Sequence, residues 1–124
     1  DPAHHAAIGR ALAPLRDEGV LVLASGSAIH NLRALRWGGT EPEAWARNFG
    51  AWMDRTVTGG DTGALIDYRR TNPNGAKAHP TDEHFLPLFV ALGAAGTEVK
   101  STCIYTGMEG AALSMDAYEF RQAA

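Results

Sequence analysis

Histidine is both the commonest metal ligand and the usual acid or base near neutral pH, and two histidines of this sequence flank a short polar segment. His79 and His84 are separated by residues 80–83 (PTDE). This spacing is neither the i, i+4 spacing of one helix face nor the His-Glu-x-x-His pattern of zincin-type metalloproteases. We expect His79 on a loop and His84 in the first turn of a helix, whose positive end keeps imidazole neutral and able to bind a metal. The alternative is that both are polar residues at a helix start.

His30 is the third candidate. It follows residues 25–27 (SGS), a turn that leaves the apolar run at residues 20–24. Ligands gather beyond the carboxyl ends of strands in open α/β sheets, so this is a place where chemistry is expected. His30 is therefore either a general acid/base on a short loop or a histidine that bonds to local backbone. His4 and His5 open the chain, where we expect exposed surface residues.

The elements that position these histidines begin with a helix over residues 3–18. Pro14 should kink this helix or end its regular part, and Gly19 suits the helix exit. Residues 20–24 (VLVLA) form a short, continuous apolar run that contains the β-branched Val20 and Val22. Such a run predicts a strand that is buried on both faces inside an α/β sheet.

Three further helices are predicted over residues 40–58, 61–70 and 82–94, followed by strands at 98–106 and 111–120. The caps are Thr40, Asp61 and Thr81. The helix over residues 40–58 carries an apolar stripe, which we interpret as core packing: Trp45, Phe49, Trp52 and Met53. The order of elements predicts an α/β fold, with a mixed β-sheet flanked by helices.

Composition narrows the function classes. A chain of 124 residues forms at most one domain, and its net charge of −3 gives no electrostatic reason to bind nucleic acid or anionic membrane. The pair Arg69-Arg70 is interpreted as a solvated face. Cys103 is the only cysteine, which excludes an internal disulfide and fits a reducing, cytoplasmic setting. The longest apolar stretch, residues 85–95, is too short to span a bilayer.

Several separated blocks of the sequence resemble the class III extradiol dioxygenases of the 4,5-DOPA dioxygenase type, within the LigB superfamily. The blocks are residues 9–22 (GRALAPLRDEGVLV), 25–32 (SGSAIHNL), 79–88 (HPTDEHFLPL), 90–96 (VALGAAG) and 113–120 (LSMDAYEF). They occur in order and cover nearly the whole chain. The resemblance implies that residues 1–124 are the C-terminal portion of an extradiol dioxygenase-like catalytic domain.

The resemblance also implies a chemistry. In this family a mononuclear non-haem Fe(II) binds a catechol and dioxygen, and the aromatic ring opens beside the diol; Zn(II) is a possible bound or substituting metal. By resemblance, His84 is a metal ligand, with Glu83 as the fallback candidate. His30 is the acid/base near the substrate. His79 and Asn31 are substrate-binding residues.

The sequence departs from the family in length, because family members are about twice as long and the segment with two further metal histidines is absent. By resemblance, Asp1 aligns to the middle of such an enzyme. We therefore expect a truncated or processed chain, or a site completed by a missing N-terminal half or another polypeptide. The alternative function is a non-catalytic fragment or binding module on the same scaffold. A zinc-dependent hydrolase that uses His79, Glu83 and His84 is the least favoured hypothesis.

Overall fold

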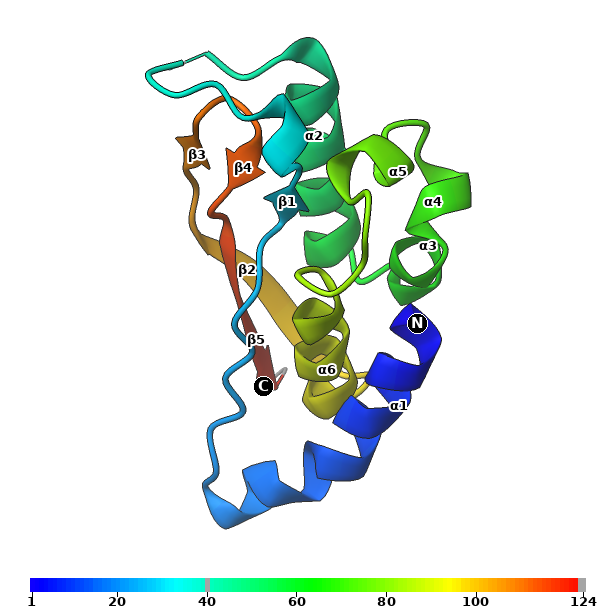
Figure 1. Ribbon diagram of the computed structural model, residues 1–124. Helices are drawn as coiled ribbons and strands as arrows, with labels where there is room; N and C mark the ends of the chain where they lie inside the picture. Colours follow the sequence, from blue (N-terminus) through cyan, green and yellow to red (C-terminus); the bar gives the residue numbers. More distant parts are fainter. Residues whose placement is uncertain (40, 123–124) are drawn as a thin grey trace.

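The structure is a computed structural model that describes residues 1–39 and 41–122. Two long helices, α1 (Pro2–Leu12) and α6 (Leu86–Ala95), pack side by side at one end (Figure 1). The helix α2 (Ala44–Thr58) lies at the other end, together with the short helices α3 (Thr62–Ile66), α4 (Tyr68–Thr71) and α5 (Gly75–Ala78). In the described part of the chain, no helix is long and apolar enough to cross a membrane.

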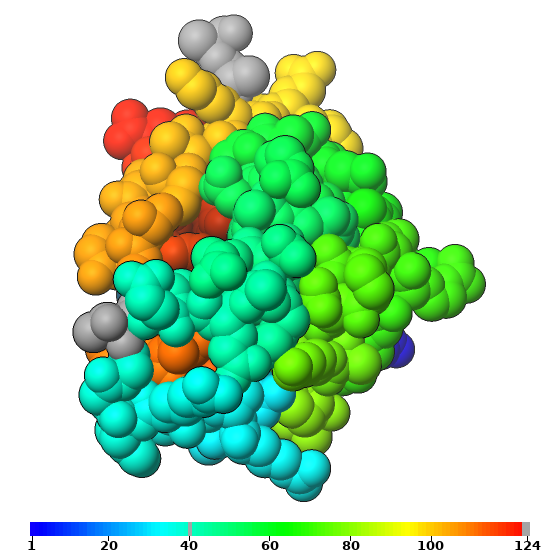
Figure 2. Space-filling view, turned by 90° about the horizontal axis from the view of Figure 1, so that it is seen from above, coloured from blue at the N-terminus to red at the C-terminus, as the bar shows by residue number. Residues whose placement is uncertain are grey.

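The strands form two small antiparallel sheets. One has the order β1-β4-β3 and contains β1 (Ile29–His30), β4 (Leu113–Ser114) and β3 (Met108–Glu109). The other pairs β2 (Val99–Tyr105) with β5 (Ala117–Gln122). Figure 2 shows α2 beside β2, with the orange-red strands β4 and β5 visible between them. The α/β class is confirmed, and every strand pairing among the described residues is antiparallel.

The first helix behaves largely as the sequence predicts. It is regular as α1 and then tightens into the 3-10 helix η1 (Ala13–Glu18), with Pro14 in the first turn of η1. Gly19 ends it with a left-handed backbone, φ 80°, which glycine adopts without steric cost. Helices α1 and α6 approach so closely that a Cβ on Gly9 or Gly93 would overlap backbone of the other helix.

The predicted strand at residues 20–24 is wrong. The segment is extended, but residues 21–26 make no backbone hydrogen bond within residues 1–39 and 41–122, and Leu21 and Leu23 are both 85% exposed. A strand needs a partner to satisfy its backbone, and the described residues supply none. The strand that does form is β1, a few residues later, where Ile29 lies opposite Ser114 and His30 opposite Leu113.

The helices after residue 40 differ from expectation mainly at their starts. Helix α2 begins at Ala44, and the predicted cap Thr40 lies outside the described residues. Asp61 caps α3 as predicted, by accepting a bond from the backbone N–H of Ala64, but the helix that follows is broken into α3 and α4.

The helix predicted from residue 82 begins only at Leu86, so His84 precedes α6 and is not in its first turn. Proline is tolerated in a first turn because it has no N–H to donate; a helix starting at residue 82 would place Pro87 in its interior. The Thr81 hydroxyl donates to the Glu83 carboxylate and does not cap the helix.

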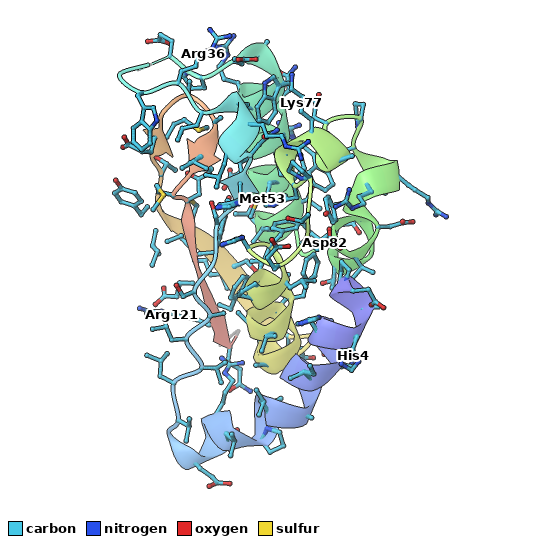
Figure 3. All side chains as sticks on the ribbon, in the orientation of Figure 1. His4, Arg36, Met53, Lys77, Asp82 and Arg121 are labelled. Atoms are coloured by element: carbon cyan, nitrogen blue, oxygen red, sulfur yellow. The ribbon has the colours of Figure 1, made fainter. Side chains whose placement is uncertain are left out.

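The apolar stripe of α2 packs inward as predicted, with Trp45, Phe49 and Met53 buried. Met53 lies on the side of α2 that faces the strands (Figure 3). The larger core side chains come from β1, α2, α3, α4, α6 and the residue just before α6: Ile29, Phe49, Met53, Val57, Leu65, Tyr68, Phe85 and Phe89.

Candidate active site

His30 sits on β1, which is anchored to its neighbour by side-chain as well as backbone bonds. The Ser27 hydroxyl lies 2.7 Å from the carbonyl oxygen of Ile29 and 3.0 Å from that of Ser114. The backbone N–H of Ala28 also donates to Ser114, at 3.3 Å. The His30 side chain is only partly buried. The strand therefore presents an accessible imidazole on a fixed backbone.

The fold brings His30 and His84 together although they are far apart in sequence. Their rings are stacked, with centroids 3.7 Å apart and planes inclined by 13°. Burial lowers the pKa of His30 below its ordinary value, and the neighbouring His84 adds to this effect, while Glu83 acts in the opposite direction. Two cationic rings in this contact would repel each other. The contact therefore favours the neutral form of His30.

Glu83 and His84 are both exposed. The Oε1 atom of Glu83 lies 3.9 Å from His84 Nδ1, with side-chain exposures of 63% and 48%. Glu83 Oε1 also accepts the 2.8 Å bond from the Thr81 hydroxyl. Its own backbone N–H and then this hydroxyl lower the pKa of Glu83. The Glu83 carboxylate beside the His84 ring favours the binding of a cation or of a hydrogen-bond donor at this place.

The loop that carries His84 is braced by an ionic cluster that the sequence did not reveal. Asp82 Oδ1 accepts bonds from the Tyr68 hydroxyl at 2.6 Å and from Arg69 Nε at 3.2 Å. Arg69 Nη2 also donates to the carbonyl oxygen of His79 at 2.7 Å. Figure 3 shows Asp82 in the loop before α6, on the side facing α3 and α4. Burial acts to raise the pKa of Asp82, but the bonds from Tyr68 and Arg69 outweigh it and the pKa is lowered.

Arg69 was therefore interpreted too simply as part of a solvated face. Its partner Asp82 lies 13 residues later in the sequence. Neither the periodicity of a helix nor that of a strand predicts a contact between two residues at this separation. The only indication in the sequence is that Asp82 lies between His79 and His84.

The two residues predicted to bind substrate occupy different surroundings. Asn31 is largely buried, and its amide is engaged on both sides: Nδ2 donates to the carbonyl oxygen of Lys77 at 2.6 Å, and Oδ1 accepts from the N–H of Arg33 at 3.1 Å. His79 is fully buried. Their contacts with a substrate stay a prediction.

The resemblance implies a bound metal, and the residues present offer only part of a site for it. Within the described ranges, no group of three or more His, Cys, Asp or Glu side chains could hold a metal ion. Imidazole nitrogens bind metals in the plane of the ring, so the nearly parallel rings of His30 and His84 cannot both direct lone pairs at one ion. These residues do not form a complete metal site, and His84, with Glu83 beside it, can offer one corner of such a site.

A hollow of about 730 Å³ borders His84. The extended residues 20–28 line one side, and α6 and β5 line the others. Apolar side chains predominate in its wall, among them Leu21, Leu23 and Met115, all of which are more than half exposed. The candidate site therefore opens onto an apolar surface.

The chain is similar in sequence to a known protein family and to curated relatives. The family described as the catalytic LigB subunit of aromatic ring-opening dioxygenase matches residues 1–114. The 4,5-DOPA dioxygenase extradiol of Beta vulgaris is 41% identical over 125 residues, which cover 97% of this chain and 45% of the relative. The protein of the same name from Escherichia coli K12 is 38% identical, with 91% of this chain and 43% of the relative covered.

A solved structure shares the fold. The crystal structure of an uncharacterized protein from Escherichia coli K12 superposes with a TM-score of 0.85 at 37% identity, covering 94% of this chain and 49% of that one. The chain thus spans about half the length of the relatives it matches.

Proposed function

We propose, since the chain belongs to the LigB family of aromatic ring-opening dioxygenases, that it supplies the acid/base histidine and one metal ligand of an extradiol dioxygenase. The substrate class is a catechol-type ring, which is cleaved beside its diol with dioxygen. The stacking of His30 on His84 carries this proposal. It joins the two segments to which the resemblance assigns the proton-transfer and metal-binding roles.

His30 acts as the base in this proposal. Burial and the neighbouring His84 lower the pKa of His30, so its ring is neutral at pH 7 and can accept a proton from a catechol hydroxyl. The same ring, once protonated, can return the proton to a later oxyanion. Its partial exposure gives a substrate access, and its place on β1 limits its movement.

His84 is the ligand to a non-haem metal, Fe(II) in the proposal, with Zn(II) as a substituting ion. When bound, that metal supplies Lewis-acid and redox chemistry toward the catechol and dioxygen. The exposed His84 ring and the Glu83 carboxylate lie on the accessible side of the loop, where an ion could be shared with groups from elsewhere. The remaining ligands come from outside the described residues.

A chimera tests this proposal. Residues 1–124 replace the matched segment of the Escherichia coli relative, and the product is loaded anaerobically with Fe(II) and then given DOPA and air. The chimera should form a yellow ring-opened product. A control chimera with His4→Ala, on the exposed face of α1, should retain this activity. A folded, metal-loaded chimera that forms no product would count against the proposal.

A second candidate is a non-catalytic module that needs another polypeptide. The exposed Leu21 and Leu23 beside the 730 Å³ hollow favour it, because apolar surface of this kind marks contact sites. This module would bind no stoichiometric metal by itself. Elemental analysis of the 124-residue chain after exposure to Fe(II) or Zn(II) tests it: tight stoichiometric metal argues against the module.

A further inference from the structure

His79 differs from the other histidines of the described chain because its side chain is 0% exposed. Its Nε2 atom lies 2.9 Å from the backbone carbonyl oxygen of Ala28. A carbonyl oxygen can only accept, so Nε2 carries the hydrogen. Burial lowers the pKa of His79 to about 4, which keeps the ring neutral at pH 7. Nδ1 is then an unprotonated nitrogen, buried without a hydrogen-bond partner among the described atoms.

Aromatic rings hold the His79 ring in place. It stacks on Phe85 with centroids 4.2 Å apart and planes inclined by 15°. Phe49 and Tyr68 meet it edge to face, each with centroids 5.8 Å away. Rotation of the ring would open this cluster, and close packing in protein interiors makes that costly. The Nε2–H group therefore points at Ala28 in a fixed direction.

This bond is one of the hydrogen bonds that join the segments carrying His30 and His84 among the described residues. A second is the 2.8 Å bond from the backbone N–H of Ser27 to the carbonyl oxygen of His84. Gly26 permits the close approach, because a Cβ at that position would overlap the same carbonyl oxygen. The ties lie two and three residues before His30. Together they set the separation of the two chain segments behind the stacked rings.

We propose that His79 is a positioning residue, whose Nε2–H bond to Ala28 fixes β1 against the loop 79–84 and thereby keeps the rings of His30 and His84 in contact. Its catalytic consequence rests on the proposed dioxygenase function; its structural consequence does not. Without this donor the buried carbonyl of Ala28 loses a hydrogen-bond partner, and β1 can separate from the loop.

Amide hydrogen exchange measured by NMR on the 124-residue chain tests the positioning role. His79→Phe keeps a flat ring and removes the donor, while His79→Gln retains an amide N–H that can reach Ala28. We expect the Ser27 amide to exchange on the order of tenfold faster in His79→Phe, relative to amides of α2, as one buried hydrogen bond is lost. His79→Gln should restore most of the protection. Exchange that rises equally in α2 and at Ser27, or does not rise at Ser27, would overturn the proposal.

A measurement on the unmodified chain keeps the proposal testable if His79→Phe does not fold. Long-range 15N–1H spectra at pH 7 should show His79 protonated at Nε2 and unprotonated at Nδ1. The opposite tautomer, or a doubly protonated ring, would contradict the bond to Ala28.

The catalytic consequence is measured separately in the chimera. There His79→Phe should lower kcat while KM is little changed, and His79→Gln should recover kcat. A fall in kcat that His79→Gln does not rescue contradicts the positioning role. An inactive parent chimera, together with the expected Ser27 response, would reject the dioxygenase function and leave the positioning role standing.

Discussion

The buried His79 ring makes the stability of the fold depend on pH. In the unfolded chain its imidazole takes up a proton near pH 6.5, whereas in the folded protein burial lowers the pKa to about 4. Between these values the unfolded state binds more protons than the folded state. The free energy of unfolding should therefore fall as the pH falls from about 6.5 to about 4, and be fully recovered above this range.

The size of this effect follows from the two pKa values. Their difference corresponds to roughly 3 kcal/mol between pH 7 and pH 4. That is a large share of the 5–15 kcal/mol by which domains are usually stable. Other groups also titrate in this range, so the comparison that isolates His79 is with His79→Gln, which retains a donor but cannot be protonated. The wild type should lose about 3 kcal/mol more than this variant on acidification.

Urea unfolding followed by the fluorescence of the three tryptophans, Trp37, Trp45 and Trp52, at several pH values between 4 and 7, measures the difference. A His4→Gln variant is the matched control, since His4 is exposed on α1, and it should follow the wild type. Parallel stability curves for wild type and His79→Gln would refute the reasoning. They would mean that the His79 ring is not held neutral by burial.

Three further substitutions test the packing around the site. Gly93→Ala should cost about 1–3 kcal/mol in urea unfolding, because the added Cβ overlaps the carbonyl oxygen of Ala6 and separates α1 from α6; an unchanged midpoint would contradict the close approach. Gly26→Ala should lower chimera turnover by on the order of tenfold or more, because its Cβ overlaps the His84 carbonyl oxygen; full activity would show that the segments need not touch. Asp82→Asn should cost below about 1 kcal/mol, since the ion pair is partly exposed, and less in 1 M salt; a loss unaffected by salt would not fit an ion pair.

Local chemistry made much of the fold predictable. The exit of the first helix at Gly19 and the inward face of α2 follow from backbone freedom and apolar spacing, which act within a few residues. The late start of α6 was also readable in principle, because Pro87 limits how far the helix can extend toward the N-terminus. The prediction gave more weight to the helix-start residues Thr81 and Asp82 than to Pro87.

Non-local contacts account for the errors. Residues 20–24 have the composition of a buried strand, but burial depends on neighbours that the described chain does not provide. The ring contact between His30 and His84 was not predicted: the resemblance assigns both residues to one catalytic site, but nothing in their spacing brings the rings together. The burial of His79 in an aromatic cluster depends on side chains from α2, α4 and the segment before α6, which meet only in the folded chain.

The division of roles between His30 and His84 is the central claim, and the metal content of two variant chimeras tests it most directly. After anaerobic loading with Fe(II) and removal of free ions, His30→Ala should retain the metal of the parent chimera and form no ring-opened product from DOPA. His84→Ala should lose the metal. Stoichiometric iron in His84→Ala, or full turnover in His30→Ala, would contradict the assignment.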